Sequence, residues 1–182
     1  MVYVHFADGF EEIEAMTIID LLRRAGIETE TVSITGHLAV TGSHGVKVIA
    51  DILFEDAVYN NCELIVLPGG LPGAENLAAH EGLREKILSF LNQGKGLAAI
   101  CAAPLVLGRA GVLEGKKATC YPGFEKELKG AEAMPDDVVS DGGVITSRGP
   151  ATAMPFALAI IESLKGKETA DEIAEGLLYV LQ

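Results

Sequence analysis

The chain has 182 residues, of which 49% are hydrophobic and 22% are charged, and this composition excludes intrinsic disorder. The formal net charge of -12 argues against nucleic acid and anionic membranes as partners, because their phosphates would be repelled. No apolar run is long enough for a membrane helix, no export signal is visible, and the three cysteines suggest no disulfide framework. We therefore expect a single cytoplasmic domain over residues 1–182.

Short β-rich segments alternate with longer helical segments along the chain, which is typical of an α/β domain with a largely parallel sheet. Strands are expected at residues 2–6, 28–33 and 64–67, with hairpins at residues 37–50, turning near Gly42-Ser43, and at 138–140 and 144–147, turning at Gly142-Gly143. Helices are expected at residues 11–25, 83–92, 104–110, 155–164 and 170–181.

Cys101 lies in the segment Ala99-Ile100-Cys101-Ala102-Ala103, where an apolar strand gives way to a helix. Several α/β enzymes carry their nucleophile on such a turn, which requires small residues two positions before and after it. The carboxyl end of a strand is also where open α/β sheets bind ligands, and the following helix N-terminus favours a thiolate. The alternative is a cysteine that fills the core as a small hydrophobic residue, and this interpretation is preferred for Cys62 and Cys120.

Glu14 shares a helical row with Ile18, Leu21 and Ala25, so it is either hydrated near the helix end or buried for a reason. An ionised Glu14 about 4 Å from a Cys101 thiolate would destabilise it by about 4 kcal/mol at an effective dielectric constant of ~20. A protonated Glu14 would instead donate a hydrogen bond to the sulfur. The pair therefore predicts a raised pKa for Glu14 and a lowered one for Cys101.

The remaining titratable residues near the N-terminus have simpler interpretations. Asp8 and Glu11 have the spacing of a capping box, and Glu12 can face water. His5 is expected to be structural because it lies within a core strand. No cluster of metal ligands is visible, so we expect neither a metal ion nor another cofactor.

Four segments taken in order resemble one known group: "ADGFEEIEA", "LIVLPGGLPGAENL", "AAICAAP" and "ITSRGPATAMPFALAIIESLKGKE". The chain resembles the ThiJ/PfpI superfamily, in the branch that includes the human parkinsonism-associated deglycase, over essentially its whole length. The resemblance implies a flavodoxin-like three-layer sandwich, a mostly parallel central sheet with helices on both faces, and the cysteine on a nucleophile elbow. It also implies a homodimer.

The same resemblance assigns roles to individual residues of the site. It places Cys101 at the nucleophile and Glu14 at the protonated acid. Gly70 and Ala102 fall where backbone N–H groups line an oxyanion hole, which is a chemistry suited to a Gly-rich turn and a helix start. Gly69 supports the tight turn before the hole.

Other positions at the expected pocket match the superfamily less uniformly. Pro150 matches a proline of the pocket wall. Tyr121 stands where this branch often has a histidine, and Ala102 stands where the peptidase branch has one. His44 falls where some relatives have an arginine that reaches toward the partner subunit's pocket. Cys120 is a candidate resolving thiol.

Three functions follow from these residues. The first is a glyoxalase III or deglycase, in which the Cys101 thiolate adds to an aldehyde such as methylglyoxal, or acts on its glycated adducts, and Glu14 moves the proton. The second is a redox-responsive sensor or chaperone with a role in oxidative stress, in which Cys101 is oxidised. The third is a peptidase or amidase, which ranks last because no histidine is well placed as its base.

Overall fold

The computed structural model describes residues 1–180 and is built on a seven-stranded sheet with the order β10-β11-β7-β6-β1-β2-β5. The strands are β1 Val2–Phe6, β2 Thr29–Ser33, β5 Ile52–Leu53, β6 Leu64–Leu67, β7 Gly96–Ile100, β10 Val138–Asp141 and β11 Val144–Ser147. Neighbours pair in parallel except β10 and β11, which are antiparallel. The sheet is therefore mixed and mostly parallel, as expected.

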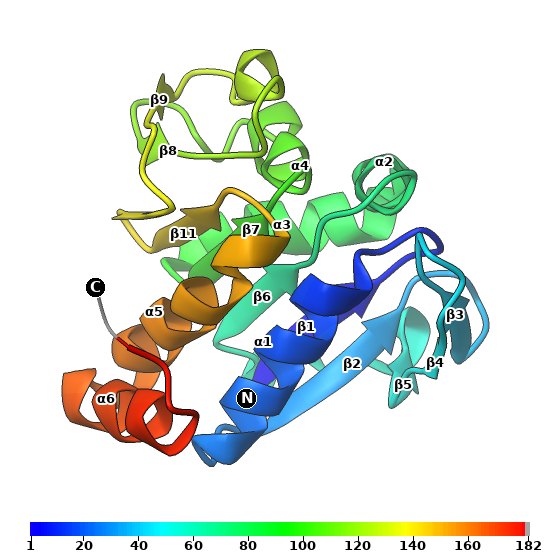
Figure 1. Ribbon diagram of the computed structural model, residues 1–182. Coiled ribbons are helices and arrows are strands. Elements are labelled where there is room, and N and C mark those ends of the chain that lie inside the picture. The colour runs from blue at the N-terminus through cyan, green and yellow to red at the C-terminus, as the bar shows by residue number, and fades with distance from the viewer. Residues whose placement is uncertain (181–182) are drawn as a thin grey trace.

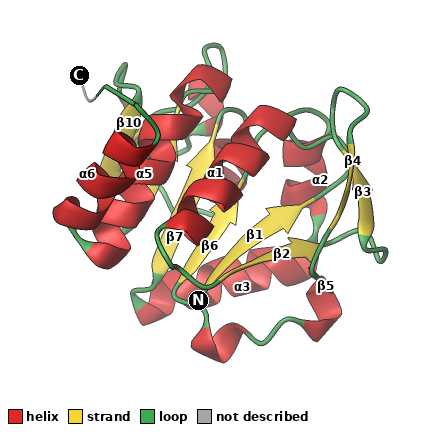
Figure 2. Cartoon of the chain, turned by 60° about the horizontal axis from the view of Figure 1, so that its bottom comes forward, coloured by secondary structure: helices red, strands yellow, loops and turns green. Residues whose placement is uncertain are grey.

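Helices cover both faces of this sheet (Figures 1 and 2). They are α1 Glu12–Arg24, α2 Gly73–Ala79, α3 Glu81–Gln93, α4 Pro104–Arg109, α5 Ala153–Lys165 and α6 Lys167–Gly176. Side chains alternate along each strand, so Val2 and Val4 join the core under α1, α5 and α6, whereas Tyr3 joins the core under α2, α3 and α4. Two buried cores with one sheet between them confirm the flavodoxin-like sandwich.

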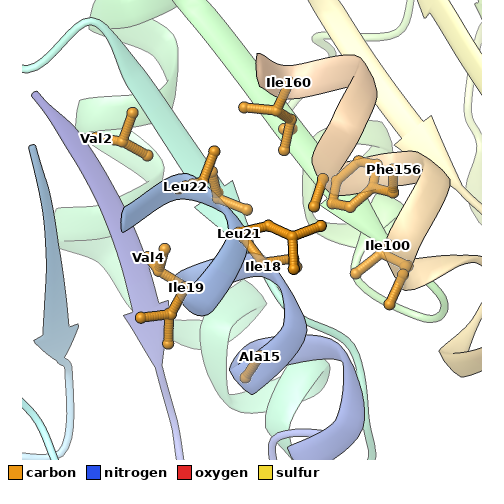
Figure 3. Close-up of a cluster of buried hydrophobic side chains, with 14 of the residues drawn as sticks. Val2, Val4, Ala15, Ile18, Ile19, Leu21, Leu22, Ile100, Phe156 and Ile160 are labelled. Carbon is orange, nitrogen blue, oxygen red and sulfur yellow. The ribbon is translucent and has the colours of Figure 1, made fainter. Parts of the chain in front are cut away.

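The apolar stripe of α1 places this helix on the sheet. Ala15, Ile18 and Leu22 follow the helical repeat, are completely buried, and lie over the strands beside Phe156 of α5 (Figure 3). The helix ends at Arg24, and Gly26 follows in the left-handed region with φ of 66°. Because Glu14 lies one helical turn before Ile18, it points inward like this stripe, at the carboxyl edge of the sheet.

Shorter elements connect these strands and helices. The hairpin of β3 Ala39–Thr41 and β4 Lys47–Ile49 is antiparallel, and β8 Lys117–Ala118 pairs with β9 Glu132–Ala133. The 3-10 turns are η1 Phe54–Asp56, η2 Tyr59–Asn61, η3 Glu125–Glu127 and η4 Pro150–Thr152. None of the helices in residues 1–180 has the length and apolar character needed to cross a membrane.

Most predicted elements are present within two residues of their expected ends, including both hairpins. Three differences stand out. Helix α2 was not predicted, because its seven residues are too few to show a clear repeat. Helix α3 begins two residues early because the His80 ring accepts the N–H of Leu83 at 3.0 Å. Helix α6 begins at Lys167 and ends at Gly176, and its predicted end at Leu181 lies outside the described residues.

Candidate active site

Cys101 follows β7 directly and occupies a turn that its neighbours hold on both sides. Its N–H donates to the carbonyl of Ser147 at 2.9 Å, and its own carbonyl accepts the N–H of Tyr121 at 2.8 Å. Its φ is 64°, a left-handed conformation that costs a residue with a side chain about 1–3 kcal/mol. The expected turn between strand and helix is thus present, but α4 begins only at Pro104, so Cys101 precedes the helix by three residues.

Gly69 and Gly70 form the turn after β6 that faces this cysteine. A Cβ on Gly69 would lie 2.5 Å from the Cβ of Cys101 and 2.8 Å from Oε2 of Glu14. Gly70 has φ of 90°, and a Cβ there would lie 2.5 Å from the backbone nitrogen of Glu11. Both positions therefore require glycine, one for close approach and the other for conformation as well.

Glu14 is the buried acid of the site, with no exposed surface. Its Oε2 accepts the N–H of Gly69 at 2.8 Å, whereas the buried Oε1 has no partner among the described protein groups that meets hydrogen-bond geometry. Burial raises the pKa of Glu14 to about 7, and the Gly69 N–H and the Cys101 thiol oppose this rise. The carboxyl group therefore exchanges its proton near neutral pH, beside the thiol.

The Cys101 thiol is half-buried and is acted on by opposing groups. Burial and then the Glu14 carboxylate raise the pKa of the thiol, whereas hydrogen bonds from the Gly70 and Ala102 N–H groups lower it. When Glu14 holds the proton, its charge no longer opposes the thiolate, and the two N–H groups remain. The net effect raises the pKa of the Cys101 thiol to about 12, so the predicted lowering is wrong while Glu14 is ionised, and a thiolate requires a protonated Glu14.

A cavity of about 350 Å³ lies beside the two segments that hydrogen-bond to the backbone of Cys101. Tyr121 and Pro150 line it, as do Asp137 and Arg148. Tyr121 is 46% exposed, and its ring would lie 3.2 Å from a Cβ on Gly149. The structure thus brings Tyr121 and Pro150 together in the lining of one cavity. Arg148, two residues before Pro150, was not among the predicted site residues because the resemblance singled out only the proline.

The acidic residues before Glu14 differ from their predicted roles. Asp8 accepts the N–H of Thr41 at 2.9 Å and does not cap α1, whose N-cap is Glu11. Glu12 is only 9% exposed, although it was expected to face water. Its carboxylate is held by the hairpin turn after β3, accepting the N–H of His44 at 2.7 Å. The sequence could not show this, because the turn lies 32 residues away.

His44 extends from this hairpin with 72% of its side chain exposed. Its Nδ1 lies 2.9 Å from Glu12 and 3.5 Å from Glu11 of the same chain, and these contacts raise its pKa. Burial alone would raise the pKa of Glu12, but hydrogen bonds from the His44 side chain and from backbone N–H groups lower it to about 2. His44 therefore bonds within its own chain, and its predicted reach into a partner's pocket stays a prediction.

Glu11, Glu12 and His44 also correct the expectation that no metal ligands cluster. One ligand atom from each lies within 4.8 Å of the others, so within residues 1–180 this group has the donors for a metal ion. The same carboxylates accept hydrogen bonds from Ser43, at 3.2 Å each, and from the hairpin backbone. These bonds explain the cluster without an ion.

The other two cysteines are buried and free. Burial, and next the charge of Glu125, raise the pKa of the Cys120 thiol to about 11. Burial also raises the pKa of the Cys62 thiol. A raised pKa disfavours the reactive thiolate, which weakens the interpretation of Cys120 as a resolving thiol.

Comparison of the sequence with known proteins identifies relatives of this chain. The model of the DJ-1/PfpI family matches residues 1–163. The chain is 43% identical to Protein dj-1beta of Drosophila melanogaster over 178 residues, which cover 96% of this chain and 95% of that protein. It is also 43% identical to Protein DJ-1 homolog A of Arabidopsis thaliana over 180 residues, which cover 97% of this chain but 46% of that protein.

A solved structure agrees with the sequence comparison. The structure described as Toxoplasma gondii DJ-1, oxidized, superimposes with a TM-score of 0.95 and 41% sequence identity, over 99% of this chain and 98% of that one. The chain spans less than half of the length of two Arabidopsis relatives, 46% of one and 41% of the other.

Proposed function

Because the chain belongs to the DJ-1/PfpI family, we propose that it is a cysteine-dependent enzyme of the glyoxalase III or protein deglycase type. Its substrates are small aldehydes such as methylglyoxal and their glycated adducts. One observation carries the proposal: a buried carboxyl group, Glu14, whose pKa burial raises to about 7, lies beside a half-buried cysteine in a strained turn. An acid with a pKa near the working pH is suited to both giving and taking protons.

The chemistry begins at the sulfur of Cys101. The sulfur bonds to the aldehyde carbon, the carbonyl electrons move to oxygen, and Glu14 holds the proton that the thiol has lost. We expect the N–H groups of Gly70 and Ala102, which lower the pKa of this thiol in the free protein, to hold the developing oxyanion. For methylglyoxal, Glu14 then returns its proton to this oxygen, which gives a hemithioacetal. Its carboxylate moves a proton from the former aldehyde carbon to the adjacent carbon, while the hydroxyl proton passes to the oxygen of that adjacent carbon. Water hydrolyses the resulting thioester and releases lactate.

Purified protein tests this proposal directly. We expect it to convert methylglyoxal to lactate without added metal or cofactor, and we expect Cys101→Ala to abolish turnover. Cys62→Ser serves as the matched control, because it removes a buried thiol that makes no contact with this pair in the described structure. Full turnover by Cys101→Ala would refute a cysteine nucleophile.

A redox-responsive sensor or chaperone is the second candidate. The Toxoplasma gondii relative is described as oxidized, which supports oxidation as a reaction open to this fold. Cys101 is the most accessible of the three thiols, since the other two are buried. Mild peroxide followed by mass spectrometry should modify Cys101 first, and uniform modification of all three cysteines would count against selective sensing.

A peptidase or amidase remains the third candidate. It needs a histidine base beside the nucleophile. In the described chain, the imidazoles of His5 and His44 bond to Tyr59 and Glu12. Neither is therefore available to Cys101 within one chain.

We also propose that the protein forms a homodimer through α1 and the β3–β4 hairpin. Large apolar side chains are exposed there: Ile13 by 59%, Met16 by 40%, Val46 by 53% and Ile49 by 71%. A groove between the two elements is lined by Met16 and Ile49. Exposed apolar clusters of this kind favour burial against a partner, and a second copy would also place the neighbouring His44 at the interface.

A further inference from the structure

The cavity beside Cys101 contains an arginine that the proposed mechanism does not use. Tyr121 and Pro122 form one wall, and Arg148, Pro150 and neighbouring residues form the other. Both walls are hydrogen-bonded to the backbone of Cys101. The N–H of Tyr121 donates to the carbonyl of Cys101, and the N–H of Cys101 donates to the carbonyl of Ser147, the residue before Arg148. These backbone hydrogen bonds bring both sides of the cavity close to the residue that carries the reacting sulfur.

The guanidinium group of Arg148 is largely free to bind a ligand. Its single contact with the described residues is made by Nη1, which lies 3.5 Å from Oδ1 of Asp137, and the two side chains are 40% and 65% exposed. An exposed pair at this distance contributes little to stability. Arg109 shows the contrast, since its guanidinium makes contacts of 2.6 to 3.0 Å with Glu75 and Glu127 and acts as a structural cross-link.

The charge around the cavity makes this position selective. The chain carries a formal net charge of -12, so most of its surface repels anions. Arg148 is the cationic group of the cavity lining, and its planar fork suits the two oxygens of a carboxylate. The carboxylates of Asp137 and Glu125 face it and would compete with an incoming anion.

We propose that Arg148 binds a carboxylate on the substrate, so that the substrate class is a ketoaldehyde whose far end is negatively charged. This inference rests on the proposed aldehyde chemistry at Cys101. The reacting carbonyl would lie at the sulfur, the connecting carbons would lie along Tyr121 and Pro150, and the carboxylate would lie at the guanidinium. A volume of about 350 Å³ is suited to a ligand larger than methylglyoxal.

The kinetic test compares two ketoaldehydes of similar length, the anionic 4,5-dioxopentanoate and the neutral 2-oxohexanal. In the wild type we expect the anion to have the higher kcat/KM. Arg148→Gln should reduce the ratio of the two kcat/KM values about tenfold, the low end for a charge-assisted hydrogen bond, because Arg148 is partly exposed. Arg148→Lys should recover part of the ratio, and Asp137→Asn should increase it.

A matched control and a binding assay separate this inference from the proposed function. Arg24→Gln removes the same charge at an exposed position on α1, and it should leave the ratio unchanged. Binding of the unreactive 4-oxopentanoate, followed by NMR in the Cys101→Ala background, should weaken about tenfold when Arg148→Gln is added. Equal binding with and without Arg148, or an equal loss in Arg24→Gln, overturns the inference. If neither ketoaldehyde is turned over, the proposed function fails, and the binding assay still decides the role of Arg148.

Discussion

The carboxylate of Glu14 and the backbone N–H of Gly69 are joined by a hydrogen bond of 2.8 Å. This bond connects α1 to the turn after β6, and it holds the acid on the side of the turn that faces the cysteine. The absent side chain of Gly69 leaves the space in which the two catalytic candidates meet, since a Cβ there would lie 2.5 Å from that of Cys101. The contact between Glu14 and Cys101 therefore depends on a residue without a side chain.

Gly69→Ala should separate the acid from the thiol. We expect a loss of turnover of at least about 100-fold and a destabilisation of about 1–3 kcal/mol, because the added methyl group has no free space. Gly176→Ala is the matched control, since a Cβ at the end of α6 would meet nothing within 4 Å. Methylglyoxal turnover and urea unfolding measure the two effects, and a Gly69→Ala protein as active as the control would contradict this account.

Glu14→Gln should remove proton transfer while keeping the hydrogen bond to Gly69, because the amide oxygen still accepts. We expect kcat/KM for methylglyoxal to fall about 10²- to 10⁴-fold and the ionisation near pH 7 to disappear from its pH profile. Ultraviolet titration of the thiolate, with Cys62 and Cys120 replaced by serine, should show that the sulfur still ionises. Glu14→Asp should recover part of the rate. Turnover by Glu14→Gln within threefold of the wild type would contradict the proposed role of Glu14 in proton transfer.

Stability should change little with pH between about 4.5 and 6.5, because two buried groups act in opposite directions. The pKa of Glu14 is raised from 4.5 to about 7 by burial, so its contribution to stability is lost as the pH rises through this range. The pKa of His5 is lowered from 6.5 to about 3, mainly by burial, so its contribution is lost as the pH falls. Each group changes the unfolding free energy by about 1.4 kcal/mol per pH unit, and the two changes cancel because they have opposite signs.

Substituting either Glu14 or His5 should reveal the pH dependence of stability that the other residue contributes. Glu14→Gln should lose about 3 kcal/mol of unfolding free energy between pH 6.5 and 4.5, because the slope of His5 then acts alone. His5→Gln should gain a similar amount over the same range, although it weakens the bond of 2.7 Å to Tyr59 at every pH. Urea unfolding of the three proteins measures this. Parallel pH profiles for all three would show that neither group titrates as its burial predicts.

Ile49→Glu should yield a monomer if α1 and the β3–β4 hairpin form the subunit interface, because the charge would be buried against the partner. Val58→Glu provides the control, since Val58 is 60% exposed and lies outside these elements. Light scattering after size-exclusion chromatography measures the mass of each variant. A dimeric Ile49→Glu, or an equal effect of Val58→Glu, would place the interface elsewhere.

Local signals sufficed for most of the secondary structure. The apolar run at residues 64–67 and the repeat of α1 predict a strand and a helix from neighbouring residues alone. Helix α2 escaped prediction because it has seven residues and depends on contacts that are distant in sequence, such as the approach of Gly73 to Gly9. Long regular elements can be predicted from their local sequence pattern, whereas short ones depend on the residues that pack against them.

The sequence by itself determined the family and the alternation of strands and helices. It also identified Glu14 and Cys101 as the candidate catalytic acid and nucleophile. Only the tertiary structure decided that Glu12 is held by a hairpin 32 residues away, that Asp8 does not cap α1, and that Arg148 stands beside the cavity. The physical reason is that repeats and turn residues act over a few positions. Burial, pKa and hydrogen-bond partners are instead set by side chains that meet only once the sheet has assembled.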